Sequence, residues 1–442
     1  MKKAFKNFPF DPGRWPFFYG WMILGLGTLG MLMSVPGQTV GISVFTDYLI
    51  TGLDIPRNFL SLAYLAGTVL SALLLTRAGR FYDRYGARIM GSIVSIALGC
   101  VLGYFSFSDV ISLGLRRTFP FLKGVAAPFI VMSIGFFLVR FTGQGTLTMV
   151  SRNAVMEWFE KRRGLANGIL GVAVSFGFSY APFVLNALIQ AGGWRWAWRF
   201  LALIVGGCFA LLVFVFFRDK PEHHNLIPDG SRFTRVKRIN PETIAVKEFT
   251  LQEARRTLTF WIFTLSLCAA SFLTTAFTFH VVSVFESSGL TRDQAVSIFF
   301  PSSIIAVGFQ LLGSFLSDYV KLKYILMVQI IGMILLSLGI IFLREGAPLI
   351  ILIAGLGINQ GLFGVNANIA WARFFGRKHL GVISGFAFAW LVAGSAAGPY
   401  LFSLSLDLSG KYVTAAIFSL AVLVVLLAGA WKANQPKVVK SR

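Results

Sequence analysis

The chain has 442 residues, of which 56% are hydrophobic and only 13% are charged. Soluble globular domains carry about 25% charged residues, so this composition excludes an ordinary soluble enzyme or binding domain and indicates a membrane protein. The formal net charge of +22 would suit a nucleic-acid partner, but the positions of the basic residues along the chain exclude that interpretation, as shown below.

Twelve apolar runs follow one another along the chain, each long enough to cross a bilayer, which takes ~17 to 25 residues. A lone strand cannot satisfy its backbone in lipid, so we expect a helix for every run. The fold class predicted is an all-α membrane protein of twelve transmembrane helices. The runs cover residues 17–48, 59–76, 89–107, 128–150, 165–191, 200–217, 260–285, 295–317, 324–343, 348–371, 380–406 and 412–431.

The basic residues lie mainly on one side of the predicted membrane. If the N-terminus is cytoplasmic, the inside segments hold 30 of the 40 Lys and Arg residues, the outside loops hold nine, and Arg140 is the remaining one. This is the positive-inside bias. We therefore expect a multi-pass protein of the plasma (cytoplasmic) membrane with both termini in the cytoplasm, in contact with the lipid bilayer and not with nucleic acid.

A polar stretch, residues 218–259, divides the chain into an N-terminal six-helix bundle (1–217) and a C-terminal six-helix bundle with its tail (260–442). Within this cytoplasmic linker, Thr250 and Glu253 have the spacing of a capping box. We expect them to open a short interfacial helix over residues 251–258. Three cysteines, Cys100, Cys208 and Cys268, fall inside apolar runs and are predicted to be small buried residues.

The two halves repeat each other. Gln144-Gly145 recurs as Gln360-Gly361, an offset of 216 residues. The spacing from Asp83 to Gln144 is 61 residues and from Asp318 to Gln360 is 42, so the first half holds 61 − 42 = 19 extra residues. Insertions of this kind map to loops, and we place this one at residues 106–127, outside the membrane.

Two parallel six-helix halves with a site between them characterise one class of secondary transporters. The segment Gly79-Arg-Phe-Tyr-Asp-Arg-Tyr-Gly-Ala-Arg88 resembles the loop signature of the major facilitator superfamily, and Arg140-Phe-Thr-Gly-Gln-Gly145 resembles its helix 4 arginine motif. Trp158–Gly168 and Phe279–Leu290 resemble the monocarboxylate and oxalate/formate exchanger branch. The resemblance implies two pseudo-symmetric bundles that rock about a midplane site. It also implies a cytoplasmic gate latched by Gly79, Asp83, Arg84 and, in the second half, Asp318.

Only three residues of the twelve runs are acidic, basic or histidine: Asp47, Arg140 and His280. Arg140 is the strongest candidate, because a cation at hydrocarbon depth is costly and usually functional. An α-helical wheel places Ser133, Gln144 and Thr148 on its face. A guanidinium can hold a carboxylate with two parallel hydrogen bonds. The alternative is a structural arginine bonded to backbone carbonyls or to glutamine.

His280 is a candidate for proton coupling, because its reference pKa is about 6.5. The alternative is a neutral histidine bonded to another helix. Asp47 is a weaker proton-coupling candidate at the outer end of the first run, where a solvated helix end is the alternative. The amides could contact substrate or bond one helix to another. They are Gln38, Gln144, Asn359, Gln360 and Asn366.

These features predict a secondary active transporter of a small organic anion, monocarboxylate-like, coupled to a proton or exchanged for another anion. A drug or other solute efflux carrier is the alternative within transport. A membrane anion sensor that does not transport is the alternative from another class. We expect a monomer. We also expect no enzymatic activity, because the spans lack a catalytic cluster. No cofactor and no metal are predicted, since no nucleotide-binding or zinc signature is present.

Overall fold

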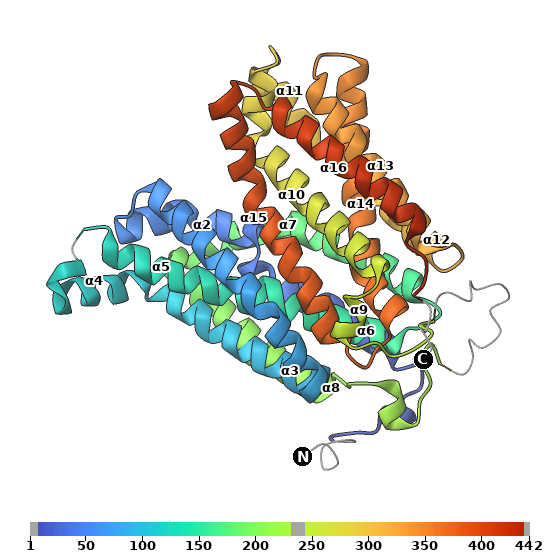
Figure 1. The fold of residues 1–442 in the computed structure, drawn as a ribbon. Coiled ribbons are helices and arrows are strands. Elements are labelled where there is room, and N and C mark those ends of the chain that lie inside the picture. The colour runs from blue at the N-terminus through green and yellow to red at the C-terminus, as the bar shows by residue number, and fades with distance from the viewer. Residues whose placement is uncertain (1–7, 123, 231–243, 437–442) are drawn as a thin grey trace. The chain divides into compact units, whose positions relative to one another are not determined.

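The computed structural model describes residues 8–122, 124–230 and 244–436, and within these ranges it contains helices and no strand (Figure 1). The helices gather into two compact units. Unit 1 comprises residues 1–158, 173–231 and 384–386, and unit 2 comprises residues 159–172, 232–383 and 387–442. Each unit is described separately below.

Unit 1 consists of long helices joined by short turns. The first apolar run is broken into two helices by a 3₁₀ turn, η2 (Val35–Gly37), because Pro36 cannot continue the hydrogen-bond ladder of a helix. The fourth run passes through a π-helical segment, η4, between two α-helices. In chain order the elements are η1 (Pro12–Arg14), α1 (Gly20–Met33), η2, α2 (Thr39–Leu53), α3 (Arg57–Ser106), α4 (Ser108–Thr118), η3 (Pro120–Leu122), α5 (Ala126–Val139), η4 (Arg140–Leu147), α6 (Thr148–Trp158), the later part of α7 (Arg163–Ala202), η5 (Leu203–Phe209), α8 (Ala210–Phe216) and η6 (Pro221–His224).

Two helices are long enough to cross a bilayer twice. Helix α3 has 50 residues and α7 has 40, whereas about 20 residues make one crossing. Each contains one glycine with positive φ, Gly86 at 85° and Gly193 at 80°, a conformation that residues with a Cβ rarely adopt. Within the described ranges ten helical stretches can span a membrane. Counting the stretches that contain these glycines as two spans each gives 10 + 2 = 12, which confirms the predicted fold class.

Unit 2 is built in the same manner. The helices α13 and α14 pack along each other, and α12 lies against α14 on another side. The elements are the beginning of α7, α9 (Leu251–Ala254), α10 (Leu258–Glu286), α11 (Arg292–Ser297), α12 (Phe299–Ser317), α13 (Leu322–Ile341), α14 (Ala347–Phe375), α15 (Leu380–Ser409) and α16 (Val413–Lys432).

Two local predictions need correction. The capping box at Thr250 and Glu253 is present, but the helix that it opens ends at Ala254. A second cap, the Thr257 hydroxyl, accepts from the Phe260 N–H and starts α10 one turn later. The cysteines are not all buried, because Cys100 and Cys208 lie exposed on helix surfaces, where a bilayer would cover them.

Candidate functional site

Arg140 lies where the break in the first span meets the π-helical segment of the fourth. We call this place the arginine junction: residues 34–39, Tyr64 and residues 140–148. Two glycines allow the contact, since a Cβ on Gly37 would stand 2.6 Å from the Val139 carbonyl oxygen and 2.8 Å from the Cα of Gly143. Broken helices and π-helical insertions both occur at binding sites of membrane proteins.

The guanidinium of Arg140 is buried, with 3% of the residue exposed. Its Nη1 donates to the Gly37 carbonyl oxygen at 3.4 Å and to the Thr39 hydroxyl at 3.3 Å. Both distances exceed the usual 2.7–3.2 Å of a hydrogen bond from nitrogen to oxygen. The Nε atom has no hydrogen-bond partner. Among the residues that the structure describes, no carboxylate pairs with Arg140.

Neutral side chains surround this cation. The Tyr64 ring lies under the guanidinium, with 5.1 Å from the Arg140 Cζ to the ring centroid, which is the distance of a cation–π contact. The Tyr64 hydroxyl is 2.8 Å from that of Thr39. The junction is therefore positively charged and is lined by groups that can donate or accept a hydrogen bond.

Gln38 lies next to Gly37 and bonds within the same junction. Its Nε2 donates to the hydroxyls of Ser34 at 3.0 Å and Thr148 at 3.2 Å. Gln144 is half-buried on the π-helical segment. π-helical i→i+5 bonding changes the angle between successive residues, so the shared face of Gln144 and Arg140 stays a prediction.

His280 lies in unit 2 and joins three helices. Its Nε2 is 3.0 Å from the carbonyl oxygen of Pro399 on α15, so this nitrogen carries a proton in the neutral ring. Its Nδ1 is 3.4 Å from the hydroxyl of Tyr412, the residue that precedes α16. That hydroxyl also donates to Ser283 at 2.9 Å. Asp47, the other proton-coupling candidate, lies exposed within α2 of unit 1.

The amides of α14 take part in bonds between helices of unit 2. Gln329 on α13 donates to Asn359 at 3.2 Å and accepts from Asn366 at 2.8 Å. Asn359 in turn donates to Thr274 on α10 at 2.9 Å. We call these four residues the amide network. Gln360, by contrast, is exposed.

The predicted gating residues fall in two places. In unit 1, Gly79 is buried, Asp83 is half-buried and Arg84 is exposed, all in the turns of α3 before Gly86. In unit 2, the Asp318 carboxylate accepts from the backbone N–H groups of Gly164 at 2.8 Å and Leu165 at 3.2 Å. The first N–H groups of a helix have no partner within the helix itself, so a carboxylate at the beginning of α7 is favourable.

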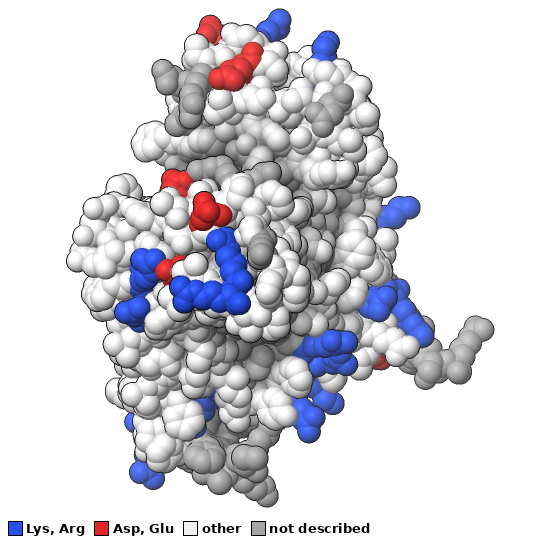
Figure 2. Space-filling model, turned by 90° about the vertical axis from the view of Figure 1, so that its left-hand side faces the viewer, with Lys and Arg blue, Asp and Glu red and all other residues white. Residues whose placement is uncertain are grey.

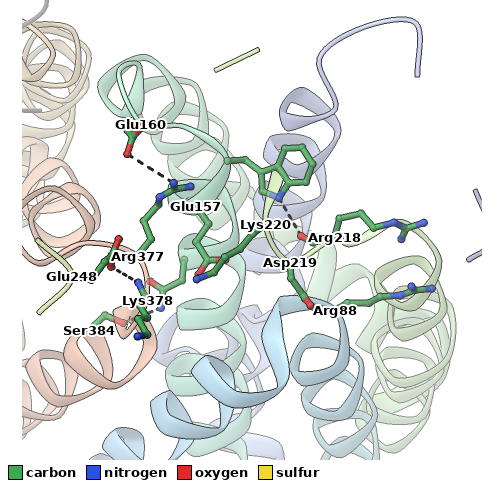
Figure 3. Close-up of polar contacts among 12 residues, drawn as sticks. Arg88, Glu157, Glu160, Arg218, Asp219, Lys220, Glu248, Arg377, Lys378 and Ser384 are labelled. Carbon is green, nitrogen blue, oxygen red and sulfur yellow. Dashed lines mark hydrogen bonds and ion pairs between the residues drawn. The ribbon is translucent and has the colours of Figure 1, made fainter. Parts of the chain in front are cut away.

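Further carboxylates accept hydrogen bonds from backbone N–H groups near the ends of spans in each unit (Figure 3). In unit 1, the Asp219 carboxylate accepts from the Arg88 backbone N–H at 3.1 Å, where α3 resumes after Gly86. In unit 2, Glu248 accepts from the Lys378 N–H at 2.6 Å. The sequence reasoning missed these carboxylates and missed Thr39 and Tyr64. The Pro36-Gly37 pair inside an apolar run is the signal that could have pointed to the junction.

Comparisons with known proteins agree with this architecture. The model of the Major Facilitator Superfamily matches residues 17–399. The chain belongs to this superfamily. Among solved structures, the fucose:proton symporter FucP of E. coli is similar with a TM-score of 0.64 and 14% identity, covering 95% of this chain and 100% of that one. The human organic anion transporter TETRAN is similar with a TM-score of 0.62 and 13% identity, over 93% and 99%. At these identities the similarity shows the fold alone.

Curated relatives match over shorter regions. "MFS-type transporter 1" of Ophiocordyceps sp. (strain BCC 1869) is 27% identical over 45% of this chain and 40% of its own length. "Citrate exporter 1" of Yarrowia lipolytica is 26% identical over 50% and 28%. A "Multidrug resistance protein B homolog" of Mycobacterium tuberculosis is 32% identical over 34% and 24%. The matched region thus spans less than half the length of each relative.

Proposed function

We propose that the protein is a secondary active transporter of a small organic anion, monocarboxylate-like, working by alternating access at the plasma membrane as a monomer with cytoplasmic termini. The observation that carries the proposal is Arg140, a buried cation without an acidic partner in the described part of the chain. Burying an unpaired ion costs several kcal/mol. Pairing with an anionic cargo would offset this cost, so the buried charge favours an anion as the cargo.

The chemistry of the arginine junction fits a carboxylate. The Nε of Arg140 lacks a partner and the two bonds of its Nη1 are long, so a carboxylate would gain more from the guanidinium than the Gly37 carbonyl or the Thr39 hydroxyl does. Charge-assisted bonds of this type are shorter and about twice as strong as neutral ones. Gln38 and Gln144 would add neutral donors, and in unit 2 Asn359, Gln360 and Asn366 are the corresponding candidates.

His280 is the proposed proton-coupling residue, with Asp47 as the second candidate. In the neutral ring Nε2 donates to Pro399, while Nδ1 faces the oxygen of the Tyr412 hydroxyl, whose proton goes to Ser283. A second proton on Nδ1 would turn it into a donor to that oxygen. Protonation would therefore strengthen the contact between α10 and the beginning of α16. Whether the carrier couples to a proton or exchanges anions depends on this residue.

The gating role proposed for Asp318 rests on its bonds to the beginning of α7. Gly79, Asp83 and Arg84 occupy the related place in the first half and are proposed to act in the same way. A carboxylate that caps a helix can be withdrawn and replaced by water at a cost of about 0.5–2 kcal/mol. Such a contact can stabilise one conformation of a carrier and still break readily during transport.

A second candidate function comes from the names of the relatives. One is called a citrate exporter, which favours an organic anion, and others are called multidrug resistance proteins, which favours drug efflux. The two differ in the charge of the cargo. Drug efflux of cations would gain from buried acids, whereas the buried charge of the junction is positive. An anion sensor that binds the same cargo without moving it is the alternative from another class.

Uptake into proteoliposomes tests the proposal. The purified chain is reconstituted and given labelled lactate, pyruvate, oxalate, formate or a cationic dye, with and without a pH gradient. We expect uptake of at least one anion, its loss in Arg140→Ala, and partial retention in Arg140→Lys, which keeps the charge but loses the fork of donors. Arg14→Ala, which removes an exposed arginine, is the matched control. Full anion uptake by both Arg140 variants would refute the proposed site, and uptake of the dye alone would favour efflux.

A further inference from the structure

Helix α4 belongs to the insert that distinguishes the first half of the chain from the second. It has eleven residues and is followed by the short turn η3. It packs against α5 and approaches the end of α2, where the Arg116 Nη2 donates to the Leu53 carbonyl oxygen at 3.4 Å. Helix α4 therefore lies at one end of unit 1. Arg218, which donates hydrogen bonds to the carbonyls of Phe8 and Phe10, lies at the opposite end.

The side of α4 that faces the protein is polar. Ser108, Asp109 and Ser112 are all buried, and they lie on one face at spacings of one, three and four residues. The Asp109 carboxylate accepts from the Nε of Arg195 at 3.0 Å and also from its Nη2. Burial raises the pKa of Asp109, but the bonds from Arg195 and from the Val110 N–H outweigh this, so the pKa is lowered.

The outward side of α4 is apolar. Val110 is 59% exposed and Leu113 is 50% exposed, and the adjoining aromatic residues Phe107, Phe119 and Phe121 are exposed too. A helix on the surface of a water-soluble protein has the reverse arrangement, with its apolar stripe toward the core. The arrangement in α4 is stable only if the medium outside is itself apolar.

The last turn of α4 adds positive charge to this apolar face. Arg117 is exposed and follows Val110 by seven residues, so it lies on the same face, while Arg116 is half-buried beside it. Figure 2 looks onto this side of unit 1 and shows a group of basic side chains beside a few acidic ones, next to uncharged surface. Helix α5, against which α4 packs, also exposes apolar side chains, among them Ile130 and Ile134.

We propose that α4 and η3 lie in the interface of one membrane leaflet, with Val110 and Leu113 among the acyl chains and Arg117 among the phospholipid phosphates. A helix with an apolar face and adjacent basic residues binds this boundary about 5–10 Å below the headgroups. On the polar face the charge of Asp109 is paired with Arg195, and the Ser108 hydroxyl donates to the Phe105 carbonyl oxygen. The insert thus anchors its end of unit 1 in the leaflet, whatever solute the chain carries.

Spin labels measure the depth of this face. In the full chain with Cys100, Cys208 and Cys268 replaced by serine, single labels are placed at Val110→Cys and Leu113→Cys. The protein is reconstituted in vesicles of phosphatidylcholine and phosphatidylglycerol, and collisions with oxygen and with the water-soluble Ni(II)EDDA are compared. Leu73→Cys, 70% exposed in α3, is the control within lipid, and His223→Cys, exposed in η6, is the control in water.

We expect the labels at Val110 and Leu113 to collide with oxygen and to be at least threefold less accessible to Ni(II)EDDA than the label at His223. Accessibility equal to that of the His223 label would overturn the proposal. So would dipolar broadening between labels on separate copies, which would indicate that a second copy covers the face. In Arg117→Glu, the Leu113 label should become more accessible to Ni(II)EDDA. An unchanged value would exclude Arg117 from contact with the phosphates.

Discussion

Gly37 and Gly143 lie with their backbones in direct contact: a Cβ added to Gly143 would stand 2.9 Å from the Cα of Gly37. The contact brings the 3₁₀ turn of the first span against the π-helical segment of the fourth. As a result, the Gly37 carbonyl oxygen lies within reach of the Arg140 guanidinium. The position of the buried cation therefore depends on two residues that lack a side chain.

Gly37→Ala should displace the turn, because the new methyl group would meet the Val139 carbonyl at 2.6 Å. Overpacking of this kind costs about 1–3 kcal/mol of unfolding free energy, and we expect weaker anion binding as well. Thermal unfolding in detergent measures the first effect. The control is Gly25→Ala, where nothing lies within 4 Å of the added Cβ. Equal effects of the two substitutions would contradict the argument.

Arg140→Met should raise the unfolding temperature while abolishing stabilisation by the anion. Replacing a buried charge with an apolar residue of similar volume often stabilises a protein by about 1–4 kcal/mol. Differential scanning fluorimetry with and without the anion measures both effects. If the variant instead unfolds at a much lower temperature, the bonds to Gly37 and Thr39 are structural and the alternative reading of Arg140 is correct.

His280→Ala should keep anion exchange but lose accumulation driven by a pH gradient, because the group that takes up the proton is gone. Tyr412→Phe removes the hydroxyl near Nδ1 and leaves the ring. It should keep accumulation and shift its pH dependence. Both are measured as uptake with and without a gradient. Undiminished accumulation in His280→Ala would leave Asp47 as the candidate.

Asp318→Asn should weaken the cap on α7, since a neutral amide accepts more weakly from the N–H groups of Gly164 and Leu165. We expect a loss of about 0.5–2 kcal/mol in stability together with a change in the transport rate at saturating substrate. Asp318→Ala should cost more than Asp318→Asn. A variant with altered stability and an unaltered rate would assign Asp318 to structure and not to gating.

The docking of α4 should not depend on pH between 8 and 5. The pKa of Asp109 is lowered in the folded protein, so its ion pair with Arg195 stabilises the fold above the unfolded pKa of about 3.9. That contribution is lost as the pH falls through the folded value. The line shape of a spin label at Leu113→Cys reports the docking. Asp109→Asn should be loosened already at pH 7, and release between pH 7 and 5 would contradict the assignment.

Much of the fold could be predicted from the sequence, because bilayer thickness sets the length of each run and lipid requires a helix. The same reasoning found the capping box at Thr250 and the isolated charges. It treated each run as one regular helix, and there it failed. The break at Pro36 and the π-helical segment after Arg140 depend on how two spans pack, which the periodicity of one run does not contain.

Of the arginine junction, Arg140 and the amide Gln38 were predicted from the sequence. Arg140 and His280 stand out because ionisable residues are rare in the spans. Thr39 and Tyr64 are ordinary residues in sequence and become neighbours of Arg140 only through packing. That Gln144 shares the face of Arg140 stays a prediction, because the helical wheel assumed α-helical angles and the segment is π-helical. The binding and gating roles remain predictions that the variants above will test.

The amide network limits how unit 2 can deform. Asn359 and Asn366 stand two turns apart on α14 and hold Gln329 of α13 at both ends of its amide. Sliding α14 along α13 by one turn, a displacement of about 5.4 Å, would break both bonds at once and leave the amide of Gln329 unpaired in a low-dielectric interior. We therefore expect helices α13 and α14 to move as one rigid body during transport.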